Sequence, residues 1–196
     1  NKVPEYIRIG NILQKKFPES KFSGGSSEKV GGLVGAAFRK QALLAICASL
    51  AVLIVYVSFR FELAYALGAV AALIHDTLIS VGVFLLPLSI IGERQISLTV
   101  VAAILTILGY SLNDTIVIFD RIRENAGLET KKSFRDIIDM SINQTLSRTV
   151  LTSVSTLIVV LTLLVYGGGA INDFALVLLI GVISGTYSSV FIATPV

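Results

Sequence analysis

Long apolar runs separated by short polar segments make up most of the chain. The runs cover residues 41–59, 63–88, 96–119, 149–166 and 174–196. A helix needs about 17–25 apolar residues to cross a hydrocarbon core of about 30 Å, and each run has roughly this length. The second run is slightly long, which indicates a tilted helix or a loose outer end. The pattern predicts an all-α polytopic membrane protein with five transmembrane helices.

The first forty residues do not share this pattern. Eight of the sixteen Lys and Arg residues lie there. Apolar spacing predicts a short amphipathic helix over residues 6–17, after which Pro18 and the Ser-Gly run at 23–27 break regular structure. This segment has too little apolar content to fold alone. We therefore expect residues 1–40 to be the end of a larger soluble domain, in a chain that is a piece of a longer protein.

Composition agrees with a membrane protein and excludes other classes of site. Hydrophobic residues account for 54% of the chain and charged residues for 15%, and the mean hydropathy is +0.83. A soluble domain of this size needs more polar surface. The single cysteine, Cys47, lies in an apolar run, so we expect neither a disulfide framework nor a metal site.

Charge in the connecting segments predicts the orientation. The segment 120–148 between the third and fourth runs carries Arg121, Arg123, Lys131, Lys132 and Arg135. The positive-inside rule places this segment in the cytoplasm, the N-terminal segment outside and the C-terminus inside. Basic residues before the first run oppose this assignment, but larger domains are translocated regardless of charge. Apolar spacing over residues 134–146 predicts a helix on the cytoplasmic surface.

An ionisable residue inside an apolar run is costly, about 2.5–3.5 kcal/mol at the bilayer centre, and is therefore informative. Asp114 lies six residues before the charged border at Asp120, and so roughly 9 Å inside it. The adjacent Asn113 favours a polar pocket within the bundle. A helix-end aspartate that reaches the headgroups is the simpler alternative. Because the side chain is short, we favour the pocket.

Arg148, at the start of the fourth run, is the natural partner of this carboxylate. Polar side chains recur around it at helical spacing, at Ser141, Gln144, Thr145, Thr152, Ser155 and Thr156. Such a stripe suits hydrogen bonds between helices. A basic anchor at the cytoplasmic border would explain Arg148 without this role. The stripe favours the inward-facing interpretation.

Two further features lie inside apolar runs. His75 and Asp76 are adjacent in the second run, so they do not share a helix face and we expect them to bond different neighbours. They are either a proton relay or a structural hydrogen-bonding pair. Gly181 and Gly185 form a GxxxG pattern, extended by Ser189, which predicts close helix packing.

Four separated stretches resemble signatures of the SecF family, in that family's order. They are GYSLNDT at 109–115 continued by DRIREN at 120–125, RFE at 60–62 with ALIHD at 72–76, QTLSRT at 144–149, and GGG at 167–169 with GTYSS at 185–189. The resemblance covers about residues 30–196. Gly32 stands where the family usually has proline, which leaves the resemblance intact.

The resemblance implies a subunit that works with SecD, separate or fused, and assists the SecYEG translocon in moving a preprotein across the inner membrane after SecA has acted. Its energy source would be the proton-motive force, with no other cofactor, no catalytic residue and no nucleic acid. Residues 1–40 would be the remnant of an α+β periplasmic domain, and 41–196 five spans of a six-span half in membrane lipid. Asp114, Arg148 and Asn113 would line the proton path.

Other functions stay open at this point. Another proton-driven exporter of the same superfamily is the nearest alternative, although the GYSLND run at 109–114 is not its usual motif. An intramembrane aspartyl protease would use Asp76 and Asp114, but the YD and GxGD motifs are missing. A purely structural scaffold leaves a costly Asp–Arg pair unexplained.

Overall fold

The computed structural model describes residues 5–17, 32–86 and 96–195, and every regular element in them is an α-helix. The chain divides into two units, Asn1–Lys40 and Gln41–Val196. In the first unit, α1 (Glu5–Lys16) is the short helix expected near the N-terminus. Its Ile9 and Ile12 side chains are exposed. That residues 1–40 derive from an external domain stays a prediction.

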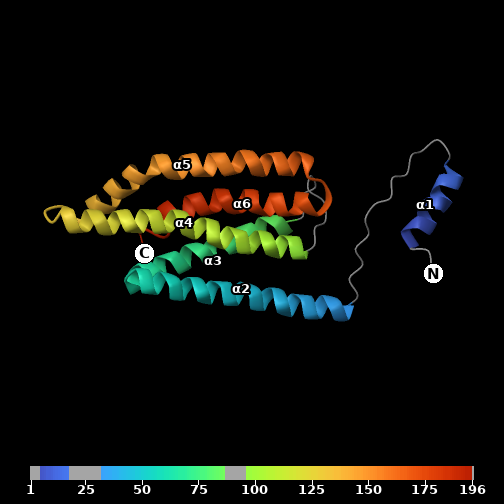
Figure 1. The fold of residues 1–196 in the computed structure, drawn as a ribbon, viewed down its shortest axis with the longest axis horizontal. Coiled ribbons are helices and arrows are strands. Elements are labelled where there is room, and N and C mark those ends of the chain that lie inside the picture. Colours follow the sequence, from blue (N-terminus) through green and yellow to red (C-terminus); the bar gives the residue numbers. More distant parts are fainter. Residues whose placement is uncertain (1–4, 18–31, 87–95, 196) are drawn as a thin grey trace. The chain divides into compact units, whose positions relative to one another are not determined.

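The second unit holds a bundle of five helices that run side by side, and the first of them begins before Gln41 (Figure 1). They are α2 (Gly32–Arg60), α3 (Leu63–Leu85), α4 (Leu98–Leu128), α5 (Phe134–Tyr166) and α6 (Gly169–Phe191). The centre of the bundle is α4 and α6, which pack on each other and on both α3 and α5. Helix α2 is peripheral, and Val57 is the one fully buried residue among its described side chains.

All five bundle helices are long and apolar enough to cross a membrane. This confirms the predicted fold class and the number of spans within the described residues. The last residues of the expected second span, 87 and 88, lie outside them, as do the segment 18–31 and the connection 87–95.

Several helix ends differ from the predicted spans. Helix α4 continues nine residues beyond Phe119, and α5 begins at Phe134, so the expected surface helix and the fourth span are one uninterrupted helix. Apolar content marks the membrane border, whereas charged residues do not stop a helix. Ion pairs one turn apart, Arg121–Glu124 at 2.7 Å and Arg123–Asp120 at 3.2 Å, support the polar extension of α4.

Local signals set the true helix ends. The Ser133 side chain accepts a hydrogen bond from the backbone N–H of Asp136 at 3.2 Å and so caps the start of α5. Helix α6 begins at Gly169, five residues before the expected Phe174, because Gly168 and Gly169 have φ of 62° and 45° and turn the chain back after α5. Only two residues therefore separate α5 from α6.

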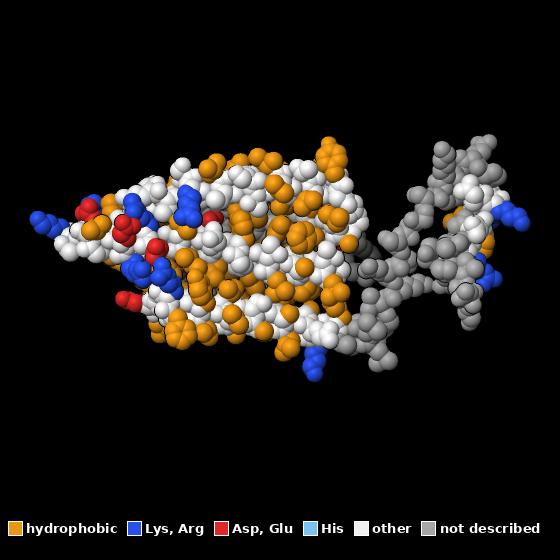
Figure 2. All heavy atoms as spheres, in the orientation of Figure 1, with side chains coloured by type: hydrophobic (Ala, Val, Ile, Leu, Met, Phe, Trp, Pro, Cys, Tyr) orange, Lys and Arg blue, Asp and Glu red, His pale blue; other side chains and the backbone are white. Residues whose placement is uncertain are grey.

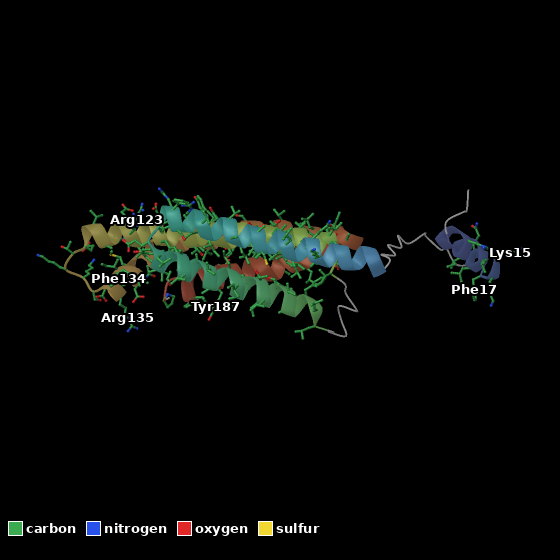
Figure 3. The ribbon with its side chains drawn as sticks, turned by 90° about the horizontal axis from the view of Figure 1, so that it is seen from below. Lys15, Phe17, Arg123, Phe134, Arg135 and Tyr187 are labelled. Carbon is green, nitrogen blue, oxygen red and sulfur yellow. The ribbon has the colours of Figure 1, made fainter. Side chains whose placement is uncertain are left out.

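One end of the bundle carries most of the charged side chains (Figure 2). Here Arg123 lies over the Phe61 ring at 5.5 Å and its side chain bonds Asp120, which also lies 3.8 Å from Arg60. Phe61 and Phe119 pack edge to face at 6.0 Å beneath them. The short turn between α2 and α3 is thereby held against α4 at the charged end. Figure 3 shows Arg123, Phe134 and Arg135 at this end.

Candidate functional site

The most fully bonded polar group in the bundle is Asp76, which is 0% exposed. Its Oδ2 accepts hydrogen bonds from Ser111 at 2.5 Å and Ser188 at 2.7 Å, and its Oδ1 accepts one from Ser184 at 2.8 Å. These serines come from α4 and α6, so one carboxylate on α3 joins the three helices. We call Asp76, His75 and the three serines the Asp76 cluster.

His75 belongs to the same cluster. Its Nδ1 lies 3.1 Å from Asp76 Oδ1, so the two adjacent residues do bond each other, contrary to the expectation that each would find a different neighbour. The imidazole is half-buried and also faces the Tyr187 ring, with centroids 6.3 Å apart. The Asp76 side chain is fully buried, whereas about a third of the His75 side chain is exposed. Among the described residues, no Lys or Arg lies within 4 Å of the Asp76 carboxylate.

Small residues on α6 bring the helices close enough for this cluster to form. A Cβ at Gly185 would lie 3.1 Å from the Ser111 Cβ and 3.5 Å from Asp76 Oδ2. A Cβ at Gly181 would overlap the Ile107 side chain of α4. Both glycines therefore face α4, the position in which a GxxxG pattern permits close packing.

Asp114 is a second buried carboxylate, 4% exposed, and its Oδ2 has no hydrogen-bond partner. Its place opposite α5 follows from the bonds on either side of it. Tyr110 donates to Ser153 at 3.3 Å, and Asn125 donates to Ser141 at 2.8 Å. In an antiparallel pair this register puts Asp114 level with Thr149, whose buried hydroxyl also lacks a partner.

Arg148 and Asn113 flank this carboxylate without bonding it. Arg148 is exposed, and no ion pair within 4 Å joins it to Asp114 among the described residues, although it is near enough to act on the carboxylate electrostatically. Asn113 is likewise exposed on α4. Of the three residues predicted for one site, the Asp114 carboxylate thus lies inside the bundle, whereas Asn113 and Arg148 lie on its surface.

The polar side chains predicted to form a stripe on α5 bond to another helix only in part. Gln144 accepts from Arg121 at 2.6 Å and from Asn125 at 2.9 Å, so the part near the charged end does join α5 to α4. The hydroxyls of Thr152, Ser155 and Thr156 instead donate to backbone carbonyls of α5 itself. In an apolar helix a hydroxyl without a partner elsewhere satisfies itself in this way.

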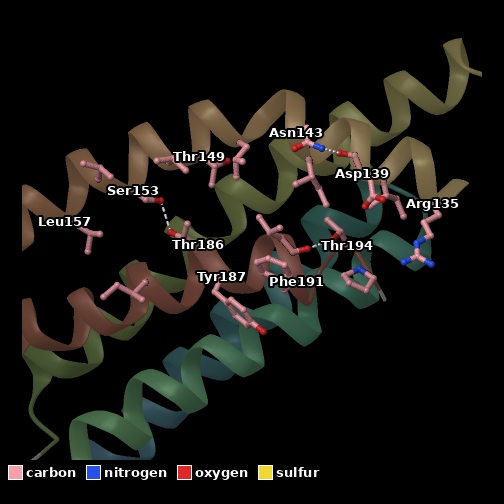
Figure 4. A pocket seen from close by; sticks show the side chains of 18 of the residues that line it. Arg135, Asp139, Asn143, Thr149, Ser153, Leu157, Thr186, Tyr187, Phe191 and Thr194 are labelled. Carbon is pink, nitrogen blue, oxygen red and sulfur yellow. Dashed lines mark hydrogen bonds between the residues drawn. The ribbon is translucent and has the colours of Figure 1, made fainter.

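A groove of about 1080 Å³ lies between α5 and α6. Figure 4 shows Arg135 and Asp139 at one end and Leu157 towards the other, with Ser153 bonded across it to Thr186 at 2.7 Å. Its walls are mainly apolar, and neither Asp76 nor Asp114 lines it. No cluster of three or more potential metal ligands occurs in the described part of the chain.

Sequence reasoning found both buried aspartates but missed the three serines that bind Asp76. Ser184 and Ser188 are four residues apart and share a helix face with Gly181 and Gly185, which is the one signal that pointed to them. No hydrogen bond joins Asp76 to Asp114 among the described residues. Aspartyl proteases require two carboxylates that meet, and these two have separate surroundings.

Comparison with known proteins identifies the family. The family model described as "Protein export membrane protein SecD/SecF, C-terminal" matches residues 9–196. The protein translocase subunit SecF of Koribacter versatilis is 52% identical over 95% of this chain and 45% of its own length. The SecF subunit of Rhodothermus marinus is 43% identical over 96% of this chain and 62% of its own length. The chain thus spans about half the length of these curated relatives.

A solved structure agrees with the sequence relatives. The crystal structure of SecDF, a translocon-associated membrane protein from Thermus thermophilus, matches with a TM-score of 0.83 and 39% identity, covering 98% of this chain and 26% of that one. The relatives are translocase subunits and not enzymes, as the sequence predicted. The chain belongs to the SecD/SecF family of protein-export membrane proteins, and within it to the SecF subunits of the protein translocase.

Proposed function

We propose that this bundle is the proton-coupled part of a SecF subunit, which works with SecD to move preproteins across the bacterial inner membrane once they have entered the SecYEG channel. Energy comes from the proton-motive force, and no further cofactor takes part. The family supports the role in export, and the bundle supplies the group that carries the proton. That group is Asp114.

One observation carries this proposal: a carboxylate inside a membrane bundle has an oxygen without a partner and an arginine nearby. An unpaired charge there is costly, so its retention indicates a function. Binding of a proton to Asp114 removes its attraction for Arg148. Release of the proton restores it. Because the two residues lie on different helices, each cycle changes the force between α4 and α5 and moves one against the other.

The surface beside Asp114 suits a protein partner rather than lipid. Beyond the exposed Leu98 at its first turn, the described exposed positions on this side of α4 are small or polar, namely Ala102, Thr106, Gly109 and Asn113. The outer face of α2 exposes large apolar side chains instead, among them Leu44, Val55 and Phe59. We assign the α4 face, together with Arg148, to contact with SecD, and the α2 face to lipid. The name SecDF of the matching crystal structure supports a pairing of the two halves.

The orientation follows from the charged end. Arg60, Arg121 and Arg123 lie there with the basic turn at 131–135, which favours a cytoplasmic position for this end. The N-terminal segment then lies on the outer side and the C-terminus on the inner side. Asp114 is nearer the cytoplasmic surface than the outer one.

Exchange of Asp114 for asparagine in the complete subunit tests the proposal. Asparagine has nearly the same volume but binds no proton at physiological pH, so we expect export in a strain that depends on this subunit to fall to the level without it. The amount of secreted preprotein is measured after a pulse of radiolabelled methionine. Asp139→Asn makes the same chemical change at an exposed acid and should export normally. Normal export by an inserted Asp114→Asn subunit would refute the proton role.

A further inference from the structure

We propose that Asp76 is a positioning residue for the Asp114 site: through Ser111 it fixes the rotation and depth of α4, and with them the place of Asp114 opposite α5. This rests on the function proposed for Asp114. None of the cluster's residues lines the groove between α5 and α6 or the one between α2 and α4. The cluster acts on the site by holding the helix that carries it.

Three bonds hold the Asp76 side chain. The three hydroxyls lie within 2.5–2.8 Å of its two oxygens, and the side chain is fully buried. A buried hydroxyl that loses its acceptor is costly, so these bonds resist separation of the helices. His75 is the one titratable side chain bonded to it, and the described parts of α4 and α6 present only serines to it. The cluster therefore joins α3, α4 and α6 into one block.

Ser111 links this block to the proposed proton site. It lies one turn before Asp114 on α4, so the two side chains leave the helix about 60° apart. Thr115 donates to the backbone carbonyl of Ser111 at 3.1 Å, which stabilises the same turn. Rotation or sliding of α4 that displaces Asp114 also breaks the bond from Ser111 to Asp76. The place of Asp114 is thus set by a bond that does not touch it.

Helix α5 is held differently. At the level of Asp114 its nearest bonds to the block are those from Tyr110 to Ser153 at 3.3 Å and between Ser153 and Thr186 at 2.7 Å, and one turn before Arg148 the exposed Gln144 accepts from Arg121 at 2.6 Å. The Tyr110 bond is long and the Gln144 bond is exposed, so both are more easily exchanged than the fully buried bonds at Asp76. The block therefore keeps Asp114 fixed, while α5 carries Arg148 towards it or away from it. In this arrangement Arg148 moves and Asp114 stays in place.

The test is the reactivity of Asp114 with dicyclohexylcarbodiimide, which modifies protonated carboxyl groups in membranes. The complete SecD–SecF complex is labelled across a range of pH, and modification at Asp114 is quantified by mass spectrometry. Ser111→Ala should shift the midpoint of this profile by about half a pH unit or more, the size expected when one hydrogen bond that fixes the site is lost. Asp76→Asn, which keeps one acceptor oxygen, should shift it in the same direction.

Two controls separate positioning from general loosening. Ser184→Ala also removes a hydroxyl from Asp76, but one contributed by α6, and should leave the Asp114 midpoint in place. Thr77→Val removes a bond within α3 only and should do the same. An unchanged midpoint in Ser111→Ala, or an equal shift in Ser184→Ala, would overturn the inference. The readout does not depend on export, so a shift seen together with normal export by Asp114→Asn would refute the proton role and leave the positioning role standing.

Discussion

Replacing Asp76 by leucine should lower the free energy of unfolding of the helix bundle by about 2–4 kcal/mol. The three serine hydroxyls around it would lose this acceptor in a buried site, and among the described residues only Ser188 has a second one, the Gly185 carbonyl at 3.2 Å. A buried hydroxyl left unpaired costs about 1–3 kcal/mol, whereas hydrogen bonds between membrane helices average about 0.6 kcal/mol because the separated helices also find partners. The expected loss lies between these limits for three bonds.

The free energy is measured by reversible unfolding of the purified protein in mixed micelles. The loss of contacts between helices is the signal that is monitored. Asp139→Leu is the control, since this aspartate is exposed and its carboxylate has no bond to another helix in the described structure. It should change the unfolding free energy by less than about 0.5 kcal/mol, as surface substitutions usually do. If Asp76→Leu had as small an effect, the cluster would not hold the three helices together.

Gly68→Leu should be comparably destabilising, for a steric reason. A Cβ at Gly68 would overlap the backbone carbonyl oxygen of Ala193, just beyond the end of α6. Ala193 is itself fixed, since it is 3% exposed and its N–H bonds the Ser188 carbonyl at 2.8 Å. A backbone atom does not rotate away as a side chain does, so α3 and α6 must separate. Forcing extra atoms into a packed core costs about 1–3 kcal/mol, which lowers the melting temperature by about 2–12 °C in a chain of this size.

The same helix provides a matched control. A Cβ at Gly82 meets nothing within 4 Å, so Gly82→Leu makes the same exchange on α3 without a clash. Thermal unfolding of both variants in one detergent isolates the effect of packing from that of composition. Equal melting temperatures would show that α3 and the segment after α6 do not approach closely at Gly68.

Hydropathy predicted the spans well because crossing a membrane imposes one requirement, a long apolar helix. Helix ends were predicted less well, since the signals that end a helix are local. The extension of α4 to Leu128 rests on ion pairs and a chain without proline. The early start of α6 rests on the positive φ of Gly168, which hydropathy does not record.

The two buried aspartates were predictable because a carboxylate in an apolar run is costly wherever it lies. The different surroundings of Asp76 and Asp114 could not be predicted from the sequence. Ser184 and Ser188 are more than a hundred residues from Asp76 along the chain, and serine is common at helix interfaces without any such partner. The register of α4 against α5, which leaves Asp114 unbonded, is a property of the packed bundle alone.

Proton movement through the complete complex tests the central claim, that Asp114 carries the coupling proton. Vesicles that contain the translocase and the SecD–SecF complex are loaded with a pH-sensitive dye, and a proton gradient is imposed before preprotein is added. With the unaltered subunit, export should draw protons across the membrane, and with Asp114→Asn the gradient should persist. Equal proton movement in the two preparations would contradict the claim.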